Sequence, residues 1–288
     1  MQKLNLMYEK SDAAIAPFQG KDARKIYEAV PEALRVNTEY DSRNKVVLGS
    51  TPFLVSGVDD VVRKYGCRTP RLVDLSLPGV MAFSNGKHYV DAKTLVARSE
   101  RDLDFYDNNN SLLRKIFELA EEELRRIKKS FMIEGFRFVP DDSTSYGLTI
   151  VKGNEFRVIQ DKRLAGKYNG SHFNEVDEFG IPIFTRNGVR TWYARDEGLS
   201  RLCLNNDLNV DSSSRSLNGS GSSGGVMVLG AEGTRGNFVK GLTDDEITCA
   251  LHPETFGMRS QLEVAIMNQD FERAAELRDK IKSIDKEL

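Results

Sequence analysis

The sequence predicts an α+β protein. Three observations lead to this prediction: helix and strand patterns mix in the first hundred residues, apolar residues then follow one long helical seam, and short β-prone runs come after it. Near residue 270, a further pattern is typical of a helical hairpin. The expected regions are a mixed α/β segment at 1–110, a long amphipathic helix at 111–133, an antiparallel β-rich region at 134–250 and the hairpin at 258–288.

The composition limits the class of protein. Hydrophobic residues make up 40% of the 288 residues and charged residues 29%, which excludes a disordered chain. No stretch approaches the roughly 20 consecutive apolar residues of a membrane span, so we expect no membrane partner. The net charge is −2, so no global positive field attracts nucleic acid.

The chain start and the cysteines indicate a reducing compartment. The first residues, MQKLNLMYEKSD, lack the basic start and apolar core of a secretory signal, so we expect a cytoplasmic protein. Cys67, Cys203 and Cys249 are scattered, which favours reduced thiols over disulfides. Cys249 and His252 could form one edge of a zinc site, but no second such pair completes it. We therefore expect neither a metal nor a cofactor.

Local signals place several short elements in the first region. Thr51 can cap a helix that begins at Pro52, because proline needs no N–H at the first helical position. Gly66 suits the end of that helix, and Thr69-Pro70 suggests a second start. Asn85-Gly86 predicts a type I′ turn between two strands. The expected elements are helices at 22–30, at 32–35 and from 52, a strand at 45–48 and a hairpin over 80–90.

A long helix is predicted from Ser111, which can cap it, to Phe131. Its apolar residues alternate steps of four and three and form one seam: Leu113, Phe117, Ala120, Leu124, Ile127 and Phe131. A seam of fewer than four heptads favours packing on the protein's own sheet. A connecting or dimerising helix is the alternative.

The same helix carries the clearest basic patch of the chain. It consists of Arg125, Arg126, Lys128 and Lys129. Phe131 and Phe136 follow closely and could stack on bases. Most such runs are solvated helix faces, so these residues are candidates for nucleic-acid contact but this is not the favoured interpretation.

The region 135–232 predicts short strands in antiparallel pairs. Lys152-Gly153-Asn154 and Asn187-Gly188 both have the composition of hairpin turns. The segment Ser212 to Gly225 is low in complexity and flexible by composition, and because an apolar run follows it, it predicts a long loop within the β region. The expected strands lie at 136–139, 148–151, 156–159, 181–184, 189–193 and 226–229.

Several motifs match catalytic patterns by their letters alone. Gly219 to Gly224 satisfies the dinucleotide-binding pattern and Gly221 to Gly225 the serine-hydrolase elbow, but both require a helix to follow, and here a strand follows. Gly49-Ser50-Thr51 lacks the lysine of a P-loop, so helix capping explains it. The pairs Asp59-Asp60 and Asp141-Asp142 are sequence neighbours, which do not face one another on a helix or a strand. The sequence therefore identifies no catalytic residue.

The segment 262–288 has the pattern of two short antiparallel helices. Leu262, Ala265 and Ile266 line one face of the first helix, and Asp270 can cap the second. Small alanines let the two helices approach closely. Apolar residues of the second helix then recur at steps of three and four: Ala274, Leu277, Ile281, Ile284 and Leu288.

At these residues the sequence resembles the UVR motif, the short hairpin found at the end of the excision-repair protein UvrB, within UvrC and in several Clp-protease-associated proteins. The resemblance is carried by Asp270 to Asp279, together with Leu262, Ala265 and Met267 upstream. In that family the hairpin is a protein-interaction module, so the resemblance implies binding of a partner. It implies neither nuclease nor helicase activity, and the chain has no P-loop.

These observations favour an adaptor or interaction protein that associates with a protein partner or with itself through the hairpin. The residues expected to bind the partner are Phe271, Ala274, Leu277, Arg278 and Ile281. Docking of the hairpin on the protein's own body is a further alternative, because about 30 residues are too few to hold a core alone. The second hypothesis is a nucleic-acid-processing or repair-associated enzyme with its active site in residues 1–232.

Overall fold

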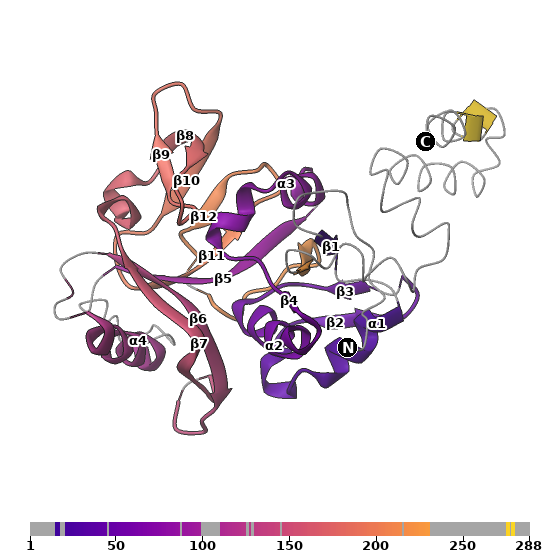
Figure 1. Cartoon of the computed structure of the whole chain (residues 1–288), viewed down its shortest axis with the longest axis horizontal. Coiled ribbons are helices and arrows are strands. Elements are labelled where there is room, and N and C mark those ends of the chain that lie inside the picture. The colour runs from indigo at the N-terminus through magenta and orange to yellow at the C-terminus, as the bar shows by residue number, and fades with distance from the viewer. Residues whose placement is uncertain are drawn as a thin grey trace.

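The structure of the chain is a computed structural model that has an α+β fold, as the sequence predicts (Figure 1). Nearly all of the body between residues 15 and 230 and a few residues of the C-terminal segment are described. The described ranges are 15–17, 21–44, 46–86, 88–98, 110–124, 127, 130–144, 146–214, 216–230, 275–276 and 278–279. Within these ranges, no helix is both long and apolar enough to cross a membrane.

Four α-helices and fourteen strands are described. The helices are α1 (Lys21–Ala29), α2 (Pro52–Val62), α3 (Pro78–Ser84) and α4 (Asn110–Glu123), with a 3₁₀ helix at Leu72–Ser76. The first strands are β1 (Ile15–Pro17), β2 (Glu39–Asp41), β3 (Val46–Leu48), β4 (Cys67–Arg68), β5 (Tyr89–Ala97), β6 (Phe131–Pro140) and β7 (Leu148–Gln160). The later strands are β8 (Ser171–Val176), β9 (Pro182–Phe184), β10 (Arg190–Ala194), β11 (Leu199–Leu204), β12 (Val210–Ser212), β13 (Gly224–Gly225) and β14 (Met227–Gly230).

One large sheet organises the body. Its strand order is β7-β6-β5-β11-β12-β10-β8-β9, and β13 pairs with β5 beside this path. The described pairs are antiparallel except β10 with β12 and β13 with β5. A smaller sheet has the order β1-β14-β4, and β2 pairs with β3. Strand β5 is central because it pairs with β11, β6 and β13.

The side chains of β5 alternate between two cores. Leu95 and Ala97 belong to the core that includes buried residues of α1, α2 and α4, whereas Val96 belongs to the core that includes the 3₁₀ helix and α3. This alternation follows from the two-residue period of a strand. Figure 1 shows α2 and α4 lying along the ribbon formed by β5, β6 and β7. The sheet is therefore covered by helices on both faces.

The predicted start of α2 is confirmed. Thr51 is its N-cap and the Thr51 hydroxyl accepts the N–H of Leu54 at 3.1 Å, while Pro52 occupies the first turn. Gly66 has a positive φ of 77° and ends the turn after the helix. The second predicted start, at Thr69-Pro70, is wrong, because the next helix begins at Leu72 with Arg71 as its cap.

The predicted hairpin over 80–90 is wrong. Its first arm lies in α3, and only its second arm enters a strand, β5. A type I′ turn needs a positive φ at both central residues, but Asn85 has a φ of −55° and only Gly86 is positive. The Ser84 hydroxyl holds the turn by donating its hydrogen to the His88 carbonyl oxygen at 2.7 Å. The apolar run Val80–Phe83 thus packs as a helix.

The long helix is shorter than the sequence predicts. Helix α4 ends at Glu123, and Phe131 begins β6. The predicted packing of its seam on the protein's own sheet is confirmed, since Leu113 and Phe117 share a core with residues of β6 and β7. The ring of Phe117 meets that of Phe131 edge to face at 5.0 Å, so the seam continues from helix to strand.

The two predicted hairpin turns of the β region are also wrong. Lys152-Gly153-Asn154 lies inside the continuous strand β7. Asn187-Gly188 connects β9 to β10, but these strands do not pair with each other, because β8 lies between them. Close packing explains the second glycine: a Cβ at Gly188 would collide with the backbone of Phe173.

The Gly/Ser-rich segment is fixed by long-range contacts rather than flexible. Arg201 Nη1 donates to the Gly219 carbonyl at 2.5 Å, and the Gly221 N–H donates to the Tyr89 hydroxyl at 2.9 Å. The Ser220 hydroxyl accepts the Ser50 N–H at 3.0 Å. Its place within the β region is confirmed, because the segment runs from β12 to β13.

A bulge interrupts the pairing of β6 with β7. Glu134 lies opposite Arg157 and Phe136 opposite Lys152, so the β7 residues 153–156 face Gly135 alone. Gly135 has a positive φ of 67°, and a Cβ there would collide with the Glu155 backbone. The bulge therefore requires glycine, and the Gly153 predicted to form a turn belongs to it.

Replacement of Gly135 tests this requirement. We expect Gly135→Ala to lower the free energy of unfolding by roughly 2–5 kcal/mol, because left-handed strain is added to overpacking. The matched control is Gly86→Ala, where φ is 72° but nothing lies within 4 Å of the added Cβ. This control should cost only about 1–2 kcal/mol. Equal losses in denaturant unfolding would show that the collision at Gly135 is unimportant.

Candidate functional site

The bulge between β6 and β7 opens a cavity against the C-terminal half of α2. The cavity has a volume of about 230 Å³, and we call it the bulge pocket. It is lined by Asp60, Arg63, Lys93, Gly135, Phe136, Arg137, Gly153, Asn154 and Glu155. The charged lining residues come from α2, β5, β6 and β7, so the bulge pocket forms only when all four elements are in place.

Asp59 is the buried centre of the charges around the bulge pocket. One of its oxygens, Oδ2, accepts hydrogen bonds from Lys93 Nζ and Arg63 Nε, each at 2.6 Å. The other, Oδ1, accepts the Thr69 N–H at 2.8 Å. Burial alone would raise the pKa of Asp59, but the attraction of Lys93 and these hydrogen bonds outweigh it and lower the pKa. The carboxyl group is therefore ionised at neutral pH.

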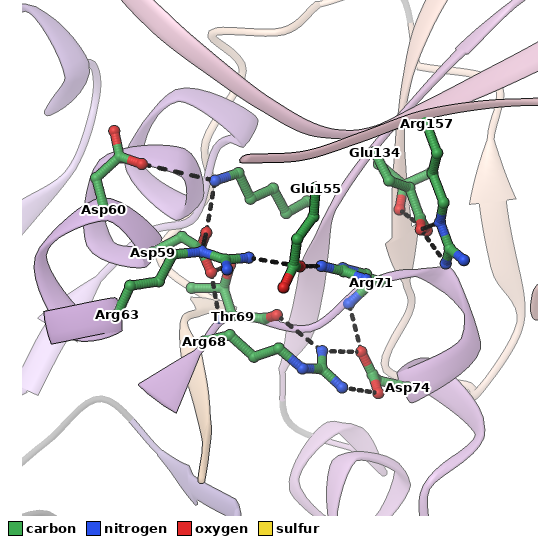
Figure 2. A network of polar contacts seen from close by, with 12 residues as sticks. Asp59, Asp60, Arg63, Arg68, Thr69, Arg71, Asp74, Glu134, Glu155 and Arg157 are labelled. Carbon is green, nitrogen blue, oxygen red and sulfur yellow. Dashed lines mark hydrogen bonds and ion pairs between the residues drawn. The ribbon is translucent and has the colours of Figure 1, made fainter. Parts of the chain in front are cut away.

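Two further carboxylates face the bulge pocket. Asp60 lies 3.8 Å from Lys93 Nζ and accepts Arg137 Nε at 2.8 Å. Glu155 accepts Arg63 Nη2 at 3.3 Å and also Arg71. The hydrogen bond from Arg63 lowers the pKa of Glu155, the burial of Glu155 opposes this, and the charge of Arg71 adds to the lowering. Figure 2 shows Glu155 between the two guanidinium groups.

Two arginine–carboxylate pairs flank this network (Figure 2). Arg68 binds Asp74 with two nitrogens, at 2.5 and 2.8 Å, in the bidentate geometry that guanidinium groups favour. Arg157 binds Glu134 at 2.5 Å, and Glu134 is fully buried. Glu134 also accepts a hydrogen bond from the Thr94 hydroxyl at 3.0 Å, so each of its two oxygens has a hydrogen-bond donor.

A second polar cluster lies beneath the Gly/Ser-rich segment. Asp91 on β5 is fully buried, and within the described part of the chain neither of its oxygens makes a hydrogen bond. Arg201 Nε lies 3.5 Å away, and its guanidinium lies over the Tyr89 ring. Burial raises the pKa of Asp91 against the pull of Arg201, and burial also raises that of Cys203 on the neighbouring strand.

The two histidines in the described ranges, His88 and His172, lie away from the bulge pocket. The ring of His88 stacks on Phe83 at 4.6 Å, and His172 lies beside Thr191 at 3.3 Å. No group of three or more histidine, cysteine or acidic residues among the described ranges could hold a metal ion. Cys67 and Cys203 are buried, and the two form no disulfide. Cys249 and His252 lie outside the described residues.

The sequence-predicted site residues are largely outside the described ranges. This is true of the basic patch at Arg125, Arg126, Lys128 and Lys129 and, in the C-terminal segment, of Phe271, Ala274, Leu277 and Ile281. Arg278 is described: it is exposed and helical, as are Glu276 and Asp279. Helical structure at these positions agrees with the second helix of the predicted hairpin.

The bulge pocket itself was missed by the sequence analysis. Lys93 lies within the largely apolar strand β5, where a single lysine gives no pattern, and Arg137 and Glu155 look like ordinary exposed strand residues. As sequence neighbours, Asp59 and Asp60 are not expected to face one another. In the structure the two carboxylates do act at one place, because Lys93 lies near both. The sequence features that point to the bulge pocket are a lysine, Lys93, within an apolar strand and a glycine, Gly153, within the run that forms β7.

Comparison with known proteins identifies one motif. Residues 257–287 match the family model of the UvrB/uvrC motif, named UVR. This match confirms the resemblance seen in the sequence and indicates a role in interaction or in DNA repair. No curated protein and no solved structure matches the chain significantly.

Removal of Lys93 tests the role of the buried centre. We expect Lys93→Met to lower the free energy of unfolding by about 3–5 kcal/mol, because it removes one partner of a buried charge. The control is Arg24→Met, which breaks the pair between the exposed side chains of Arg24 and Glu28 and should not change stability measurably. A small loss for Lys93→Met in denaturant unfolding would show that Arg63 and Thr69 suffice for Asp59.

Asp91 gives a pH-dependent prediction. Because its pKa is raised in the folded state, its stabilising contribution is present below its ordinary pKa of 3.8 and is lost as pH rises through the folded value. Between these two values the free energy of unfolding, relative to that of Asp91→Asn, should fall by up to about 1.4 kcal/mol per pH unit. Parallel pH profiles for the two proteins in denaturant unfolding would contradict this expectation.

Proposed function

We propose that this chain is an interaction protein that binds a protein partner or a second copy of itself through the C-terminal hairpin at 258–288. The observation that carries the proposal is the match of residues 257–287 to the UVR motif. In proteins with this motif the hairpin serves protein interaction. The body from β1 to β14 would then be the cargo or scaffold that the hairpin connects to its partner.

Size requires the hairpin to dock on another surface. Two short helices of about 30 residues lie below the roughly 40 residues at which a domain begins to hold its own core. Their apolar seam must therefore be covered by another surface. Phe271 follows directly after the predicted turn, and Ala274, Leu277 and Ile281 already supply an internal seam without it. We infer that Phe271 is the anchor that enters the partner.

Charge supports specificity of this contact. Arg278 and Glu276 are exposed on the second helix, so they are accessible to a partner. Arg278 Nε lies 3.2 Å from Asp279, a contact between two exposed side chains that contributes little by itself. A partner that offers a carboxylate to Arg278 would add a charge-assisted hydrogen bond at the rim of the contact.

Truncation and a point variant test the proposal together. The full chain, residues 1–257 and full-length Phe271→Ala are compared for partner recovery by affinity purification and for self-association by sedimentation. Phe271→Ala should weaken association by about 2 kcal/mol or more, as expected for an interface hot spot, and leave the melting temperature of the body unchanged. Residues 1–257 should melt cooperatively and recover no partner.

Three outcomes would contradict the proposal. Unchanged association of Phe271→Ala with a strongly lowered melting temperature would make Phe271 an internal staple of the hairpin. A non-cooperative product from residues 1–257 would make the hairpin part of the main core. Co-purification of nucleic acid with the full chain, lost steeply as salt rises, would favour the repair-associated enzyme, for which the convergence of charges at the bulge pocket is the supporting observation.

A further inference from the structure

We propose that the bulge pocket binds a phosphoryl group in its monoanionic, protonated form, either inorganic phosphate (H₂PO₄⁻) or the phosphate monoester of a small molecule. The proposal concerns the body alone and does not depend on the function of the hairpin. It rests on the size of the bulge pocket, on the unused hydrogen-bond donors that face it and on the balance of charge around it.

The size of the bulge pocket favours a compact bound group. Its volume is about 230 Å³, whereas pockets for drug-sized molecules have roughly 300–1,000 Å³. At about 30 Å³ per water molecule, this volume corresponds to roughly seven or eight waters, which is enough for one compact polar group. A single phosphoryl group with a short substituent fits this volume.

Lys93 supplies donors that the described part of the chain does not use. Its ammonium group has three N–H bonds, but only Asp59 accepts one within hydrogen-bond distance. Asp60 is 3.8 Å away, which is an ion pair and too long for a hydrogen bond. The Lys93 side chain is only 4% exposed, so water outside the pocket does not satisfy the remaining donors. A hydrogen-bond acceptor bound inside the bulge pocket would satisfy them.

Arg137 and Arg63 add donors at the rim. Among the described residues, Arg137 uses only Nε, toward Asp60, and both of its Nη groups make no hydrogen bond. Arg63 uses Nε and Nη2, which leaves Nη1. A guanidinium with free Nη groups matches the geometry of a phosphate or carboxylate oxygen pair. The bulge pocket thus offers cationic donors from three elements to an oxyanion.

The carboxylates that line the bulge pocket select among oxyanions. With Asp59 and Arg71, which bind lining residues, the group has four cations against three carboxylates and so one excess positive charge. A dianion would carry more negative charge than this excess, and its oxygen acceptors would face the acceptor oxygens of Asp60 and Glu155. A phosphoryl group, with a second pKa of about 6, can keep a proton and donate it to a carboxylate. A carboxylate ligand, with a pKa near 4, has no proton to donate at neutral pH.

Titration with simple anions tests the proposal on the full chain in a phosphate-free buffer. Inorganic phosphate, ethyl phosphate, sulfate and acetate are added separately at pH 6 and at pH 8, and binding is followed by calorimetry and by ³¹P NMR. Phosphate should bind about tenfold or more tightly than sulfate, because sulfate lacks the proton for Glu155 or Asp60. Phosphate binding should weaken from pH 6 to pH 8, whereas sulfate binding should not change.

A variant pair localises the binding. Arg137→Gln should weaken phosphate binding about tenfold, as expected for loss of one charge-assisted contact, with an unchanged melting temperature because the Arg137 side chain is 53% exposed. The matched control is Arg24→Gln, which removes another exposed arginine paired to a carboxylate and should leave binding unchanged. Lys93→Met is not required, so failure of that variant to fold would not affect the test.

Each outcome of the titration decides for or against the proposal. Ethyl phosphate binding as tightly as inorganic phosphate would assign the bulge pocket to monoesters, and much weaker binding would assign it to the inorganic ion. Equal binding of sulfate, preferential binding of acetate, no binding of any anion, or equal effects of Arg137→Gln and Arg24→Gln would each overturn the proposal.

Discussion

The buried ion pair between Lys93 and Asp59 is the interaction on which the arrangement of the body depends. It joins the central strand β5 to α2, at a distance of 2.6 Å between Nζ and Oδ2. Removing two charges from water costs several kcal/mol each, and their attraction repays this only with good geometry and further hydrogen bonds. Arg63 and Thr69 supply those bonds to Asp59. The pair therefore specifies where α2 lies rather than adding much net stability.

The other charged groups are arranged around this pair in pairs of opposite sign. Asp60 lies between Lys93 and Arg137. Glu155 lies between Arg63 and Arg71 (Figure 2). The same arrangement that fixes α2 on the sheet also brings partly satisfied cations to the edge of a cavity. The position of α2 and the polar lining of the cavity thus depend on one set of residues.

Elements set by local chemistry could be predicted from the sequence, and elements set by the sheet could not. The cap at Thr51 and the proline after it are local features, and α2 begins there. By contrast, residues 80–83 have strand propensity but are helical, and Gly153 looks like a turn residue but lies in a strand. Both depend on packing with residues distant in sequence. The bulge pocket was not predictable for the same reason.

The Gly/Ser-rich segment shows how composition can mislead. Its glycines and serines carry little apolar surface, which is typical of a flexible linker. Here small side chains allow close backbone approach, and a Cβ at Gly224 would collide with Ser50 and Tyr89. Hydroxyl and amide groups then hold the segment over β5 and β11 through hydrogen bonds to Tyr89, Ser50 and Arg201. The small residues of this low-complexity segment thus allow it to pack closely on its neighbours.

The pairing of β1 with β14 has a consequence for folding during synthesis. Ile15 lies opposite Leu229, so the first described strand has its partner at the far end of the body. Strand β5 likewise gains its neighbour β13 only when Gly224 and Gly225 have been made. At about 5–20 residues per second, roughly 10–40 s separate the two members of the first pair on the ribosome. During that interval the nascent chain has unpaired strand edges, so its body must complete its sheets late, after most of its sequence has emerged.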